Sequence, residues 1–264
     1  MSRARTIRSI AVVLGILAGS GCAASRPDAR WGDDVDLTPG WTAVRSAARE
    51  TAEEPETWLP PLLGLLLQVD DWDGRVSDWA RRETPVYGST VRALDASDAL
   101  VEVARGTWAV SVLLAPDGDL GVDWAWAKAK GAGLQLGAIA TTFTATSTLK
   151  NATQRRRPDG SNARSFPSGH ASHTGVCAAL AHRNAATVLG PGGRPVSRAV
   201  TDGTALATGW ARVEGGKHFP SDVLIGFAIG HFLGGFVDRA FRTLPSGWRI
   251  TVEPNGLGVT IDVP

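Results

Sequence analysis

Apolar residues recur at helical spacing along most of the chain after Leu59. Positions three and four apart share one face of an α-helix, so this pattern predicts amphipathic helices. The predicted helices lie at about 59–69, 74–82, 91–114, 122–149, 169–189, 197–211 and 220–241. Pro-Asp-Gly at 116–118 and Gly-Pro-Gly-Gly at 190–193 mark turns between them. The pattern therefore predicts an all-α helical bundle.

The periodicity changes near the end of the chain. Residues 248–252 and 257–263 alternate in character on either side of Asn255-Gly256, a sequence that favours a tight turn. We expect a small C-terminal β-hairpin at about 248–263. Together with the helices, it forms one predicted domain over 58–264.

The residues before this domain have a different composition. Residues 23–57 are rich in Pro, Asp, Glu and small residues. This composition is typical of a linker, and we expect at most one short helix in it, near Trp41 to Glu50.

The first 22 residues have the layout of a secretory signal peptide. Three arginines precede a short apolar run from Ile10 to Ala18, which is too short to span a bilayer. Gly19-Ser20-Gly21 then leads to Cys22, an arrangement similar to the lipobox of bacterial lipoproteins, although Gly19 stands where that motif usually has Leu. We expect an exported, periplasmic protein that an acylated Cys22 anchors in the membrane. The alternative is a plain signal peptide cut near Ala23 or Ala24.

Composition limits the classes of partner. The chain is 43% hydrophobic and 20% charged, which is typical of a globular protein, and its net charge is +1. It has no basic arm, so no nucleic-acid partner is expected. The apolar stretch 223–237 is short, rich in Gly and interrupted by His231, and it predicts a core helix rather than a membrane span. We interpret Cys177 as a small buried hydrophobe. We interpret the polar cluster of Asp95, Ser97 and Asp98 as the start of a helix.

Three motifs between residues 150 and 222 carry candidate chemistry. In the first, six residues separate Lys150 from Arg157-Pro158. Arg212 is the first residue of the third motif. Lys and Arg side chains can surround the oxygens of a phosphoryl group, and Pro158 keeps Arg157 out of helical geometry. We interpret the neighbouring Arg155 and Arg156 as solvated surface charges.

The second motif, Pro167-Ser168-Gly169-His170, precedes an apolar helical run. Ser168 suits a helix N-cap, and Gly169 permits close approach of a ligand to the backbone. Free N–H groups at a helix N-terminus attract anions. His170 would then lie in the first turn, where it could protonate a leaving alkoxide.

The third motif continues from Arg212 to His218 and Asp222. Pro220 suits the first turn of a helix, so the Asp222 carboxylate could reach back to His218. A carboxylate on one imidazole nitrogen would fix the tautomer and free the other nitrogen for nucleophilic attack.

These motifs resemble, in order and spacing, the signature of the type 2 phosphatidic acid phosphatase superfamily. Ala211 stands where the third motif usually has Ser. The resemblance implies a phosphoric monoester hydrolase of the acid phosphatase or lipid phosphatase kind. His218 would be the nucleophile of a phosphohistidine mechanism, with His170 as the acid and Asp222 as its partner. Lys150, Arg157, Ser168, Gly169 and Arg212 would bind phosphate, with no metal or other cofactor.

Two alternatives stay open. The superfamily also holds vanadium-dependent haloperoxidases, in which His218 would ligate vanadate. A non-catalytic phosphate- or lipid-binding module would need only the cations. The partner in the first interpretation is a phosphorylated small molecule or lipid, and the motifs do not distinguish between these.

Overall fold

The computed structural model describes residues 31–32, 35–116, 121–242, 248–253 and 256–261. The predicted signal peptide at 1–22, with Cys22, lies outside these residues, and so does Asn255 of the predicted hairpin turn.

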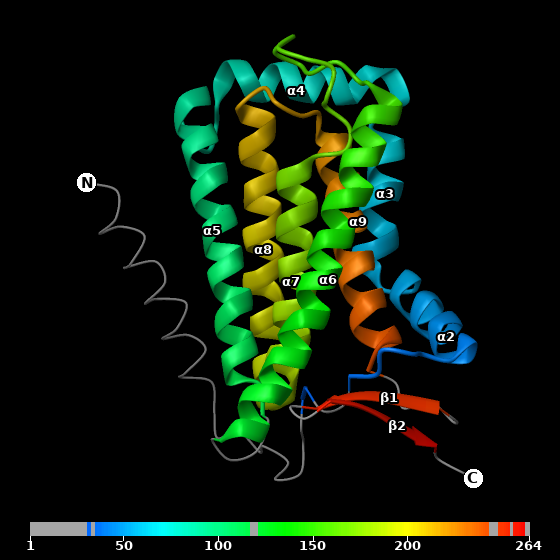
Figure 1. Cartoon of the computed structure of the whole chain (residues 1–264). Helices are drawn as coiled ribbons and strands as arrows, with labels where there is room; N and C mark the ends of the chain where they lie inside the picture. The colour runs from blue at the N-terminus through cyan, green and yellow to red at the C-terminus, as the bar shows by residue number, and fades with distance from the viewer. Residues whose placement is uncertain (1–30, 33–34, 117–120, 243–247, 254–255, 262–264) are drawn as a thin grey trace.

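Helices dominate the described part of the chain. Their bounds are α2 Trp41–Ala52, α3 Pro55–Leu66, the short 3₁₀ helix η1 Val69–Asp71, α4 Trp72–Glu83, α5 Thr90–Leu114, α6 Val122–Thr153, α7 Gly169–Val188, α8 Gly193–Glu214 and α9 Pro220–Ala240. Helices α5 to α9 run side by side with α3, and α4 crosses one end of this bundle (Figure 1). Helix α7 is central, since it packs against α5, α6, α8 and α9. The predicted all-α bundle is confirmed.

Strands β1 Trp248–Glu253 and β2 Gly256–Ile261 pair in antiparallel fashion, with Trp248 opposite Ile261. They lie at the end of the bundle opposite α4 (Figure 1).

Two stretches differ from the sequence prediction. Helix α5 begins at Thr90, where the Ser89 hydroxyl accepts a hydrogen bond from the backbone N–H of Arg92. The polar residues 95–98 therefore lie inside α5 and not at its start. The described part of the predicted linker also folds against the body, because α2 packs on α9 through the buried residues Ala47 and Thr51.

The contact between α7 and α9 depends on glycine. A Cβ atom on Gly230 would lie 2.0 Å from the carbonyl oxygen of Ser172, and one on Gly226 would lie 2.5 Å from that of Ser168. Real Cβ atoms do not approach backbone oxygen so closely, so these glycines set the distance between the helices. The first turns of α7 and α9, which carry the second and third motifs, are thereby held together.

Helix α9 is longer than the apolar stretch 223–237 seen in the sequence. Among the described residues, α9 is the helix that is long and apolar enough to cross a membrane. Of its apolar 18-residue window, 56% is buried inside the protein. Core helices of soluble proteins meet the same criterion, and α9 contacts α2, α3, α6, α7 and α8.

Candidate active site

All three motifs meet at the end of the bundle that α4 crosses. Lys150 lies in the last turn of α6, His170 begins α7, and Arg212 lies in the last turn of α8. Backbone hydrogen bonds hold the connection after α6 in place: the N–H of Ser165 donates to the Arg155 carbonyl at 2.9 Å, and the N–H of Ser168 donates to the Asp222 carbonyl at 2.9 Å. Motifs up to 70 residues apart in the chain are thus brought to one place.

His218 is buried, and its Nδ1 lies 2.6 Å from the carbonyl oxygen of Ser165. A carbonyl oxygen only accepts, so Nδ1 carries the proton and Nε2 keeps its lone pair. The Asp222 carboxylate lies 3.8 Å from Nδ1, too far for a hydrogen bond. The Ser165 carbonyl, rather than Asp222 as the sequence suggested, fixes the tautomer.

Burial is the main reason that the pKa of His218 falls to about 4, and the nearby Lys150 and Arg212 charges lower it further against the opposing Asp222 carboxylate. The imidazole is therefore neutral at neutral pH, as a nucleophile must be.

Asp222 is held by a dense set of donors. It accepts hydrogen bonds from Arg155 Nη1 at 2.7 Å, from the Ser165 hydroxyl, and from the backbone N–H of Phe219 at 2.9 Å. Burial alone would raise the pKa of this carboxyl, but His218, Ser165 and Arg155 hold it below its usual range. Asp222 therefore stays ionised beside His218.

Arg155 is not a solvated surface charge, contrary to the sequence interpretation. Its guanidinium bridges Asp222 and the buried carboxylate of Asp73 on α4, at 2.7 and 2.8 Å, and lies over the Phe219 ring. Asp73 in turn accepts from the backbone N–H and hydroxyl of Ser221. This network ties α4 to the start of α9. Arg156 is exposed, as expected.

The positive charge of Arg157 lies close enough to lower the pKa values of Lys150 and Arg212. Lys150 has a pKa of about 8, chiefly because of burial and then the Arg157 charge. Its Nζ donates to the carbonyls of Arg164 and Pro167. Burial, followed by Arg157, lowers the pKa of Arg212 to about 10. Such a concentration of positive charge favours a bound anion.

Two guanidinium nitrogens of the candidate site are left without partners among the described residues. The Nε atoms of Arg157 and Arg212 are buried and have no hydrogen-bond partner in the described part of the chain, although Arg212 Nη1 donates to Ser97 at 3.2 Å. Buried donors normally find an acceptor. The oxygens of a phosphate would satisfy both.

The second motif opens α7 as predicted. The Ser168 hydroxyl accepts from the backbone N–H of Ala171, which confirms it as the N-cap. His170 Nε2 lies 2.9 Å from the Asp98 carboxylate of α5. Burial and the Arg212 charge lower the pKa of His170, while Asp98 opposes them. The contact with Asp98 could not be predicted from the motifs, because it depends on how α5 packs against α7.

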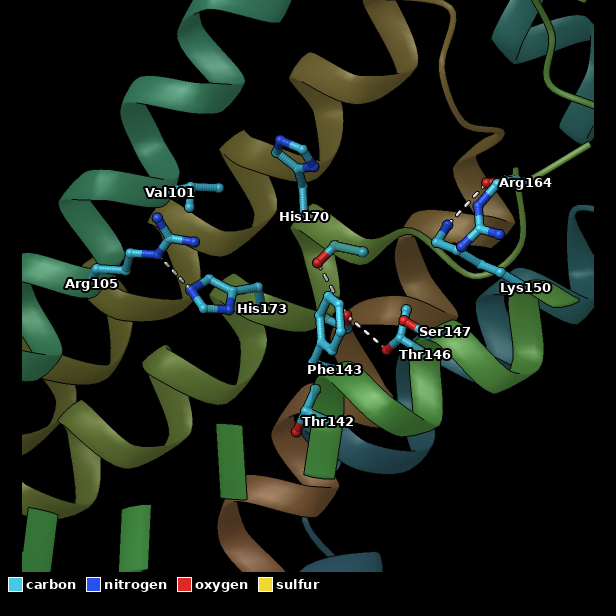
Figure 2. Close-up of a pocket in the computed structure, with 12 residues that line it drawn as sticks. Val101, Arg105, Thr142, Phe143, Thr146, Ser147, Lys150, Arg164, His170 and His173 are labelled. Atoms are coloured by element: carbon cyan, nitrogen blue, oxygen red, sulfur yellow. Dashed lines mark hydrogen bonds between the residues drawn. The ribbon is translucent and has the colours of Figure 1, made fainter. Parts of the chain in front are cut away.

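A cavity of about 340 Å³ opens beside Lys150, Gly169 and His170. Figure 2 shows its lining side chains, which come from α5, α6 and α7 and include Arg105, Phe143 and His173. The volume falls in the range of small-molecule sites.

Cys177 is buried in the core, and burial raises the pKa of its thiol to about 12. This bears out its interpretation as an inert hydrophobe.

Comparison with known proteins agrees with the motifs. The PAP2 superfamily model matches residues 131–245, a segment that contains all three motifs and ends before β1. Over this segment the chain is similar to the type 2 phosphatidic acid phosphatase superfamily, as the motifs suggested. The match does not extend to the hairpin.

Individual relatives are similar over part of their length. The chain is 40% identical to Lipid A 1-phosphatase of Porphyromonas gingivalis over 109 residues, which are 39% of this chain and 23% of that protein. It therefore spans about a quarter of the length of the curated relative. A transmembrane PAP2 type phosphatidylglycerolphosphate phosphatase from Bacillus subtilis has 22% identity and a TM-score of 0.47, over 68% of this chain and 90% of that structure.

Proposed function

We propose that this protein is a phosphatase that hydrolyses phosphate monoesters, including lipid phosphates or pyrophosphates, through a phosphohistidine on His218. The observation that carries this proposal is the cluster of three cations, Lys150, Arg157 and Arg212. Arg157 and Arg212 each keep one buried donor that has no partner in the described residues. The cluster lies around the neutral His218 and beside His170. The family relationship supports it, because the curated relative is itself named a phosphatase.

In the first step, the three cations and the N–H groups that begin α7 bind the phosphoryl oxygens. The lone pair on His218 Nε2 forms a bond to phosphorus, and the bond to the ester oxygen breaks with its electron pair on that oxygen. His170 supplies the proton that the leaving oxygen needs. The His218 imidazole becomes positively charged, and the Asp222 carboxylate at 3.8 Å stabilises that charge.

In the second step, water attacks the phosphohistidine and His170 accepts a proton from it. Inorganic phosphate leaves, and His218 returns to its neutral form. Because cations of the protein itself neutralise the phosphoryl oxygens, the proposed reaction needs no metal.

A lipid substrate and a membrane location fit together in this proposal. The chain would be exported to the periplasm and anchored through an acylated Cys22. Helix α3 exposes a row of large apolar side chains that an acyl chain or a membrane surface can contact. They are Trp58, Leu59, Leu62, Leu63, Leu65 and Leu66.

The test is release of inorganic phosphate from a panel of alkyl, aryl and lipid phosphates. We expect activity to survive a strong chelator and to be blocked by vanadate, which mimics the five-coordinate transition state. His218→Ala should abolish turnover and the acid-labile label trapped on the protein. His182→Ala, on α7 beyond the motif, is the matched control and should retain both. Activity lost in chelator and restored by a divalent ion would contradict the metal-free mechanism.

A further inference from the structure

We propose that Arg105 binds a second anionic group on the leaving-group side of the substrate. The favoured substrates would then be phosphate monoesters whose leaving group itself carries a phosphate or a carboxylate. The inference rests on the proposed function, and it assigns a specificity residue that the three motifs do not contain.

The cavity determines where the leaving group lies. Lys150 and Arg105 line opposite sides of it, and His170 and His173 of α7 lie between them (Figure 2). Because His170 protonates the leaving oxygen in the proposed mechanism, that oxygen faces His170. The rest of the leaving group must then extend into the cavity towards Arg105.

Arg105 is held in place for such a contact. Its Nε donates to His173 Nε2 at 2.9 Å, and its Nη1 donates to Glu102 at 2.6 Å. Burial, followed by the Arg105 charge, lowers the pKa of His173 to about 4, so His173 is a neutral acceptor that does not repel the guanidinium. An arginine fixed by two partners loses little further freedom when it binds a ligand.

Part of the guanidinium remains open to a ligand. Nη2 makes no hydrogen bond with the residues that the structure describes, and about half of the side chain is exposed, at 51%. Glu102 is on the solvent side of the pair, with 60% exposure, and it does not line the cavity. A phosphate or carboxylate in the cavity can therefore accept from Nη2.

The cavity also has apolar lining residues. Val101 and Phe143 are two of them, and Phe143 is largely exposed. A short carbon chain between the scissile phosphate and the second anionic group would contact them. The cavity thus combines two anion sites with an apolar spacer.

The experiment compares two esters with the same spacer, propane-1,3-diol bisphosphate and propane-1,3-diol monophosphate. We expect wild-type kcat/KM to be about 10- to 100-fold higher for the bisphosphate, since a charge-assisted hydrogen bond discriminates to about that extent. Two equivalent phosphates account for only a factor of about two of this preference.

In Arg105→Gln the ratio of the two kcat/KM values should fall towards two, whereas Arg105→Lys should retain part of it. Arg49→Gln is the control, because Arg49 makes a similar contact with Glu53 on the distant α2. The inference would be overturned if the wild-type ratio is near two, or if Arg105→Gln keeps the wild-type ratio. Either result would leave the proposed function standing. If neither ester is hydrolysed, the proposed function fails and the inference with it.

Discussion

At the scale of single residues, Ser165 contacts both members of the His218–Asp222 pair. Its carbonyl holds the Nδ1 proton of His218 while its hydroxyl donates to Asp222. Asp222 is therefore free to act through charge, and Arg155 fixes its position. The tautomer of His218 therefore depends on a backbone carbonyl and not on a side chain.

The protonation states predict different pH profiles for two kinds of ester. His170 must be protonated to act as an acid, and its pKa lies below the ordinary 6.5. For an alkyl phosphate, kcat/KM should therefore fall as the pH rises through that lowered pKa. An aryl ester such as p-nitrophenyl phosphate needs little proton donation. Its kcat/KM should persist until Lys150 loses its proton, at a pH of about 8.

The variant His170→Ala makes this prediction specific. It should lower kcat/KM for the alkyl ester by about 10²–10⁴-fold and for the aryl ester much less. It should also remove the fall in kcat/KM with rising pH that distinguishes the alkyl ester from the aryl ester. Both profiles are measured from pH 4 to 9. Equal losses on both esters would mean that His170 does not protonate the leaving group.

The motifs predict that Lys150, Arg157, Arg212, His170 and His218 lie close together, and the structure brings them to one end of the bundle. Their roles at that site stay a prediction. The partners Arg155, Asp98 and Asp73 were missed or misread. Their contacts span 67, 72 and 148 residues, and such pairings depend on helix packing that no local pattern encodes.

At the scale of elements, hydrophobic periodicity predicted where the helices lie. It did not predict which of their polar residues contact the candidate site. The predicted stretch 91–114 corresponds closely to α5, and 122–149 lies within α6. The polar residues 95–98 looked like a cap because polar side chains usually lie at helix ends or on the solvent side. In α5 Ser97 contacts Arg212 and Asp98 contacts His170.

The close approach of α7 and α9 gives a test at this scale. Gly230→Ala would place a methyl group against the Ser172 carbonyl, so we expect it to lower the free energy of unfolding by about 1–3 kcal/mol. Gly203→Ala on α8 has open space around the new methyl group and should be neutral or stabilising by up to about 1 kcal/mol. Urea denaturation of both variants measures the difference. A Gly230→Ala variant as stable as Gly203→Ala would show that the helices can separate at little cost.

At the scale of the whole molecule, the candidate site and the exposed apolar face of α3 belong to one helical body. The described residues before α2 are anchored to this body as well. Trp31 is buried, and its Nε1 donates to Asn184 of α7 at 3.0 Å. Cys22 precedes Trp31 by nine residues in the sequence. A lipid on Cys22 would therefore keep the helical body close to the membrane.

The two cysteines of the chain allow this proposed anchor to be tested with a matched control. Cys22→Ala should release the protein from membranes or block its maturation, because acyl chains contribute about 0.8 kcal/mol for each buried CH₂ group. Cys177→Ala removes the other cysteine, a core residue of α7, and should leave the protein in the membrane fraction.

Membrane and soluble fractions are compared for both variants after washing with high salt and then with detergent. Wild-type protein should resist salt and be released by detergent, since the anchor is apolar. Release by salt alone would exclude a lipid anchor. If Cys22→Ala still needs detergent, the apolar face of α3 or the helix α9 holds the protein in the membrane, and Cys22 does not.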